Sequence, residues 1–100
     1  MSAENVDQDY WNIVDAFLEK ANTETENSDV GMVASALMNA AARYSAFYVA
    51  GSSESRKDLK EDKDVLVQDI SREFKQRFAS NLEDYIENYK IYLLKDQEAD

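Results

Sequence analysis

The chain has no proline and only two glycines, Gly31 and Gly51, in 100 residues. Proline and glycine form most of the turns of β-rich folds and long loops. Their scarcity favours long, uninterrupted helices, and 44% of the residues are apolar, which is enough for a core. We therefore expect an all-α protein, a three-helix antiparallel arrangement in a single domain over residues 1–100, with solvated tails at 1–6 and 95–100.

The first predicted helix covers residues 7–23. Its apolar side chains recur at helical spacing on one side, and polar side chains occupy the other. Asp7 or Asp9 is expected to cap its N-terminus. The apolar face contains Tyr10, Ile13, Val14, Phe17, Leu18 and Ala21.

The second predicted helix covers residues 29–50, with Ser28 or Asp29 as its N-cap and Gly51 as its C-terminal stop. Large side chains share one face and small ones share the opposite face. A helix with two such faces is expected to be packed on both sides, as the central helix of a bundle. The large face contains Val30, Val33, Leu37, Tyr44, Phe47 and Tyr48, and the small face contains Ser35, Asn39, Ala42, Ala46 and Ala50. We assign Tyr44 and Tyr48 to the core.

The third predicted helix covers residues 55–94. A stripe of apolar residues stays within about 60° of one line along it: Val67, Ile70, Phe74, Phe78, Leu82, Tyr85, Tyr89 and Tyr92. Ser80 and Glu83 have the spacing of a capping box, so this long C-terminal helix is either continuous and bent or broken near Ser80. The unbroken stripe favours a continuous helix.

The third helix is longer than the others and is expected to overhang them. Forty helical residues span about 60 Å, whereas the second helix spans about 32 Å. An aromatic surface at the overhanging end is typical of an interface. The candidate interface residues are Tyr85, Ile86, Tyr89, Tyr92 and Leu93. A second copy in a two-fold homodimer is the simplest cover. The alternative is that the first helix or a folded-back fourth helix covers this surface within one chain.

Arg43 is the only charged residue between residues 30 and 53, and Asn39 lies one helical turn before it. Their side chains can meet the same ligand or carboxylate, which makes them a candidate anion-binding pair. The competing interpretation is an interhelix salt bridge from Arg43 to Asp15, Glu19 or Asp84. We favour the salt bridge, because an isolated arginine on a packed helix needs a partner.

The net charge of −10 limits the classes of partner. So acidic a chain repels phosphate backbones and anionic membrane surfaces, so we expect no nucleic-acid and no membrane partner. The opening MSAENVDQDYW lacks the basic and apolar regions of a signal peptide, and no run approaches a membrane span of about 18 apolar residues. We therefore expect a cytoplasmic location.

Catalysis is not expected. The chain contains no histidine and no cysteine, which removes the commonest general base, the thiol nucleophile and the imidazole metal ligand. The isolated glycines cannot form a phosphate-binding loop. The carboxylates of Asp58, Glu61, Asp62 and Asp64 point in different directions around a helix, without the spacing of a calcium loop. We predict no catalytic residue, no metal site and no cofactor.

Three stretches resemble a family of small bacterial proteins, the domain-of-unknown-function 3144 family. They are YWNIVDAFLEKAN, the segment from Ala41 to Phe47, and a motif formed by Leu82, Asp84, Tyr85, Ile86, Asn88 and Tyr89. The resemblance covers most of residues 8–94. It implies a small helical bacterial protein and transfers no catalytic residue.

The sequence thus predicts a non-enzymatic helical interaction protein that self-associates through its C-terminal helix. One alternative is a monomeric adaptor that presents Tyr85–Leu93 to another, unidentified protein. A further alternative is an acidic decoy for basic surfaces, whose binding would weaken as ionic strength rises.

Overall fold

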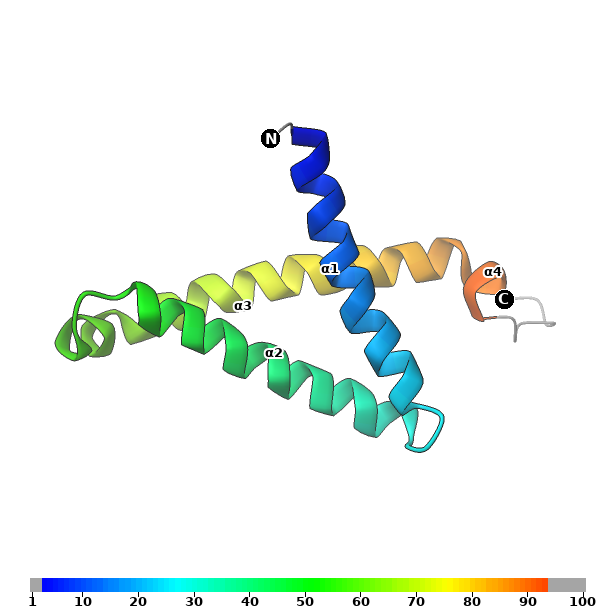
Figure 1. The fold of residues 1–100 in the computed structure, drawn as a ribbon, viewed down its shortest axis with the longest axis horizontal. Helices are drawn as coiled ribbons and strands as arrows, with labels where there is room; N and C mark the ends of the chain where they lie inside the picture. Colours follow the sequence, from blue (N-terminus) through cyan, green and yellow to red (C-terminus); the bar gives the residue numbers. More distant parts are fainter. Residues whose placement is uncertain (1–2, 94–100) are drawn as a thin grey trace. The chain divides into compact units, whose positions relative to one another are not determined.

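The computed structural model describes the backbone of residues 3–93 and the side chains of residues 6–93. Over these residues it contains four helices and no strand (Figure 1). They are α1 (Ala3–Glu24), α2 (Val30–Ser52), α3 (Arg56–Glu87) and α4 (Tyr89–Leu93). The prediction of an all-α protein with a long C-terminal helix is confirmed. The predicted tail at 95–100 and the predicted helix end at Leu94 lie outside the described residues.

Contacts divide the chain into two units, Met1–Gly51 and Ser52–Asp100. The first unit holds α1 and all but the end of α2, and the second holds α3 and α4. The single domain over residues 1–100 and the antiparallel order of the helices stay predictions.

The first helix begins earlier than predicted. Because α1 starts at Ala3, residues 3–6 are helical instead of forming part of a tail, and Asp7 and Asp9 lie inside the helix instead of capping it. Residues 3–6 contain no glycine or proline, so no helix-breaking residue opposes this earlier start.

Asp29 caps α2, as one of the two predicted candidates. The main-chain N–H of Met32 donates to Asp29 Oδ2 at 3.2 Å. The predicted stop at Gly51 is wrong, because Gly51 is helical and α2 continues to Ser52. Gly51 does not adopt the left-handed φ of a glycine cap. A helical glycine costs only about 1 kcal/mol relative to alanine, which the preceding turns of α2 tolerate.

The third helix is continuous through Ser80, as the unbroken stripe favoured, and the alternative of a break near Ser80 is not observed. Its N-cap is Ser55, which has an extended backbone and whose hydroxyl oxygen accepts the N–H of Asp58 at 3.1 Å. The helix ends instead at Asn88, eight residues beyond Ser80, and the predicted single helix over 55–94 becomes α3 and α4. Asn88 adopts φ −113° and ψ 32°, outside the helical range.

Among the described residues, neither unit forms the predicted core. No described side chain is buried, and Tyr44 and Tyr48, which we assigned to the core, are 72% and 70% exposed. The half-buried apolar residues of the first unit include Ala21, Val33 and Leu37, near the turn that joins α1 to α2, and Val14 and Val49, farther from it. Farther from the turn, the two faces of α2 are exposed, because a helix face is buried only where another element lies over it.

Candidate functional site

Arg43 and Asn39 lie one turn apart on α2, and both are exposed. Within the described part of the first unit, Arg43 forms no ion pair with Asp15 or Glu19. The ion pairs there stay within one helix, as in Lys20 with Glu24, whose Nζ and Oε2 are 2.7 Å apart. The interhelix salt bridge expected for Arg43 is therefore not formed in this unit, and its guanidinium is open to solvent.

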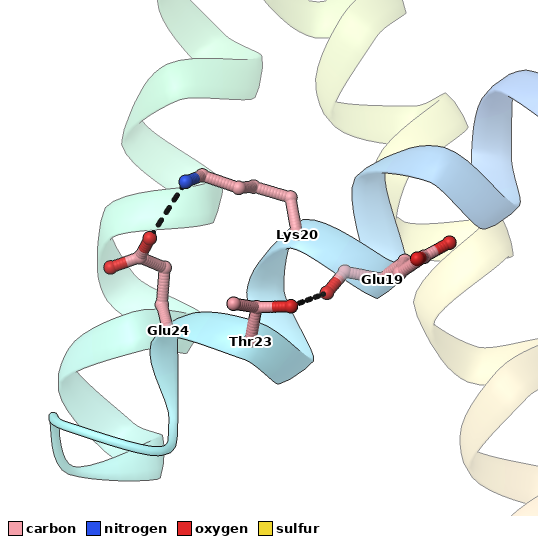
Figure 2. A network of polar contacts seen from close by, with 4 residues as sticks. All are labelled: Glu19, Lys20, Thr23 and Glu24. Atoms are coloured by element: carbon pink, nitrogen blue, oxygen red, sulfur yellow. Dashed lines mark hydrogen bonds and ion pairs between the residues drawn. The ribbon is translucent and has the colours of Figure 1, made fainter.

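The last turns of α1 contain an ion pair and a hydrogen bond from a side chain to the main chain (Figure 2). Lys20 reaches along the helix to Glu24, while the Thr23 hydroxyl donates to the main-chain carbonyl of Glu19 at 3.0 Å. The side chain of Glu19 points away from this ion pair (Figure 2). Hydrogen bonding between the two partners raises the pKa of Lys20 and lowers that of Glu24. Such an exposed pair contributes little to stability.

The second feature is the aromatic face of α2. The rings of Tyr44 and Phe47 lie 5.8 Å apart with a tilt of 42° between their planes. Together with Tyr48, they form an apolar surface that is more than two-thirds exposed. An exposed cluster of large aromatic side chains is a feature of interaction surfaces.

The third feature is an apolar stripe on α3, which we call the α3 stripe and define as Phe74, Phe78, Leu82 and Tyr85. The rings of Phe74 and Phe78 stack with their centroids 6.1 Å apart. All four side chains are exposed, from 46% for Tyr85 to 58% for Phe78. The stripe therefore offers a continuous apolar face for contact with another surface.

The predicted interface residues divide between two helices. We call this set the C-terminal surface: Tyr85 and Ile86 at the end of α3, and Tyr89, Tyr92 and Leu93 in α4. The structure brings the rings of Tyr85 and Tyr92 into an edge-to-face contact at 5.0 Å. Ile86 stays well exposed, whereas Tyr89 and Leu93 are only slightly above one-third exposed. The short α4 thus partly covers the surface that the sequence assigned to an interface.

Asp84 and Asn88 hold this junction together. The side-chain amide of Asn88 donates to the main-chain carbonyl of Asp84 at 3.2 Å and to its Oδ1 at 3.0 Å. The hydroxyl of Tyr92 also bonds to the Asp84 carboxylate, which raises the pKa of Tyr92 above its ordinary value of 10.0. Two groups, the Asn88 amide between the helices and the Tyr92 hydroxyl of α4, therefore converge on the Asp84 carboxylate.

Asn88 was not among the predicted site residues, although a signal for it was present. Asparagine favours helix ends, because its short polar side chain bonds to nearby main-chain groups. Its spacing of four residues from Asp84 allows such a bond on the face of a helix. The continuous apolar stripe outweighed this signal, because it favoured one unbroken helix through Asn88.

Among the described side chains, those of residues 6–93, no group of three or more acidic residues is arranged to hold a metal ion. In the same part of the chain, no helix is long and apolar enough to cross a membrane.

These features define a small all-α protein that exposes apolar helix faces. The chain belongs to the family described as "Protein of unknown function (DUF3144)", which matches residues 10–86. The match includes the segment from Ala41 to Phe47 and extends through Ile86, so the resemblance noted from the sequence is confirmed. It stops just before Asn88, and α4 lies outside it. No curated protein and no solved structure matches the chain.

Proposed function

We propose that the protein is a non-enzymatic helical interaction protein of the bacterial cytoplasm that self-associates as a homodimer through its C-terminal helical region. The observation that carries the proposal is the exposure of apolar residues along α3 and α4. Ile86 and Phe78, for example, are 66% and 58% exposed. Apolar surface of this kind is seldom left in water, and aromatic side chains are enriched where proteins meet.

The non-enzymatic part of the proposal rests on the residue types present. A chain without histidine or cysteine lacks the commonest proton-transfer and nucleophilic groups. Self-association needs none of these groups, because it depends on apolar contact area.

The choice of partner rests on charge. The net charge of −10 disfavours nucleic acids and anionic membranes, so the partner is expected to be a protein. A second copy of the chain is always present at the same concentration and offers the same apolar surface, as a two-fold interface requires.

The test is the solution mass of the wild type and of Tyr89→Glu, measured by light scattering on a size-exclusion column at matched concentrations. Gln76→Glu is a matched control, since it adds the same charge on the face of α3 opposite the stripe. We expect a dimeric wild type, a dimeric control and a monomeric Tyr89→Glu. A monomeric wild type would contradict self-association and leave binding to a different protein, which a pull-down with the same variants would examine.

A further inference from the structure

The charges beside the α3 stripe form an ordered pattern. At about 100° per residue, Arg77 and Asp84 lie roughly 95° and 115° from the centre of the stripe and on the same side of it. They are seven residues apart, which is about 10.5 Å along the helix axis. This separation is too large for the two side chains to pair with each other. One edge of the stripe therefore carries a positive charge and, two turns later, a negative charge.

The charge difference extends to whole segments of α3. Residues 72–77 contain three basic residues and one acidic residue, whereas residues 83–87 contain three acidic residues and no basic one. The two segments lie at nearly equal distances before and after Ala79 and Ser80. The segment of α3 before Ala79 and Ser80 therefore has a net positive charge, and the segment after them has a net negative charge.

We propose that two copies of the chain pair through antiparallel α3 helices, in contact along the α3 stripe, about a two-fold axis level with Ala79 and Ser80. This inference rests on the proposed self-association and specifies its geometry. Phe74 of each copy then lies level with Tyr85 of the other, because the two residues are equally many positions before and after the point where the axis crosses the helix.

The same axis pairs the charges. In an antiparallel pair with this symmetry, an edge of one stripe faces the same edge of the other copy. Arg77 therefore lies beside Asp84 of the second copy, and the symmetry forms this ion pair twice. In a parallel pair, each charged segment would instead lie level with the same segment of the second copy, so that like charges face each other. Charge complementarity thus favours the antiparallel arrangement.

Existing contacts are compatible with this pairing. Arg77 is 2.9 Å from Glu73 on its own helix, an exposed contact that an arginine with five donors can keep or exchange. Asp84 already accepts the Asn88 amide, and a carboxylate has further lone pairs for a second donor. The Tyr92 ring contacts Tyr85 edge-on, which leaves other parts of the Tyr85 ring free for Phe74 of the second copy.

A cross-linking experiment tests the geometry, and the absence of native cysteine makes it specific. The variants Phe74→Cys and Tyr85→Cys are oxidised separately and as an equal mixture, and covalent dimers are measured by non-reducing electrophoresis. The antiparallel pair predicts cross-linking in the mixture only, because residues 74 and 74 of the two copies lie about 16 Å apart along the axis. A disulfide requires Cα atoms within about 7 Å.

The other outcomes separate the two proposals. Strong cross-linking of each variant by itself would overturn the antiparallel geometry and keep self-association. A dimeric wild type by light scattering, with no cross-link in any sample, would place the interface away from the α3 stripe. A monomeric wild type would contradict the proposed function itself.

Charge reversal gives a second measurement that keeps the four side chains of the α3 stripe. Because Asp84→Arg also removes the bonds of Asp84 to Asn88 and Tyr92, the double variant is compared with Asp84→Arg alone. Arg77→Glu and Asp84→Arg should each weaken the dimer about tenfold, since each places like charges together twice. The double variant should recover most of the affinity, because it restores both pairs with their signs exchanged. Gln76→Glu is the control for added charge, and circular dichroism checks that helicity is unchanged. Single variants with wild-type dissociation constants would overturn the proposed pairing of Arg77 with Asp84.

Discussion

The side chain of Asn88 bonds to both the main chain and the carboxylate of Asp84, at 3.2 and 3.0 Å, and this pair marks the end of α3. The carbonyl of Asn88 in turn accepts the N–H groups of Ile91 and Tyr92 at 3.0 and 3.1 Å. One asparagine therefore closes α3 and begins α4. The change of direction at this residue places Tyr92 against Tyr85.

The first prediction concerns this junction. Asn88→Ala removes both side-chain bonds to Asp84 and replaces a poor helix former by the best one, a difference of about 0.5 kcal/mol in propensity. We expect α3 and α4 to merge into one helix in the variant. Carbon chemical shifts of residues 87–90 should become fully helical, and the proximity of Tyr85 to Tyr92 should disappear. Unchanged shifts at these residues would show that Asn88 does not cause the break.

The second prediction concerns pH. Hydrogen bonding to Asp84, and the repulsion between its carboxylate and a tyrosinate, raise the pKa of Tyr92 above 10.0. Because the folded-state pKa is the higher one, this contact stabilises the docked α4 below about pH 10 and is lost as pH rises through the raised pKa. The difference in tyrosinate absorbance between the wild type and Tyr92→Phe should titrate above pH 10. Tyr44→Phe, which alters an exposed ring on α2, is the control. A difference titration centred at pH 10 or below would contradict the Asp84 contact.

The third prediction compares two serines of α3. Ser55→Ala removes the N-cap bond to the N–H of Asp58 and should lower the free energy of unfolding by about 1 kcal/mol. Ser80→Ala is the matched control, since Ser80 lies inside the continuous helix, where alanine is at least as favourable. Urea unfolding followed by circular dichroism measures both changes. A larger loss of unfolding free energy for Ser80→Ala than for Ser55→Ala would indicate that Ser80 forms the capping interaction with Glu83.

The fourth prediction concerns Arg43. Its side chain is exposed and forms no ion pair in the described part of its own unit. Arg43→Ala should therefore change the free energy of unfolding by no more than about 0.5 kcal/mol, as is usual for surface substitutions. Denaturant unfolding of the two proteins checks this. A loss well above that range would show that Arg43 has the packed, paired environment that the sequence suggested.

Much of the secondary structure could be predicted from the residues. The absence of proline and the helical spacing of apolar residues are local properties, and they indicated three long helices. Residue type also gave Asp29 as one of two candidate caps, with Ser28 as the other. The stripe from Val67 to Leu82 also belongs to one helix, as its periodicity required. The alternative of a folded-back fourth helix anticipated α4, although not its position.

The helix ends were less predictable. Gly51 and Ser80 have the residue types of a stop and a cap, but each remains helical, because the i to i−4 bonds of a helix outweigh a weak local preference. The helix ends at Asn88, whose side chain bonds to Asp84, yet the Asn81 amide makes a similar bond to the main-chain carbonyl of Arg77 inside α3. Residue type alone does not distinguish these cases.

By itself, the sequence determined that this chain is helical, acidic and without the usual catalytic groups, since these properties depend on residue identity and spacing. Only the tertiary structure decided that Tyr44 and Tyr48 are exposed and that Tyr92 lies against Tyr85 and Asp84. The physical reason is that periodicity shows which residues share a helix face but not whether anything covers that face. The ring contact also depends on φ −113° and ψ 32° at a single residue, Asn88, which redirect the chain.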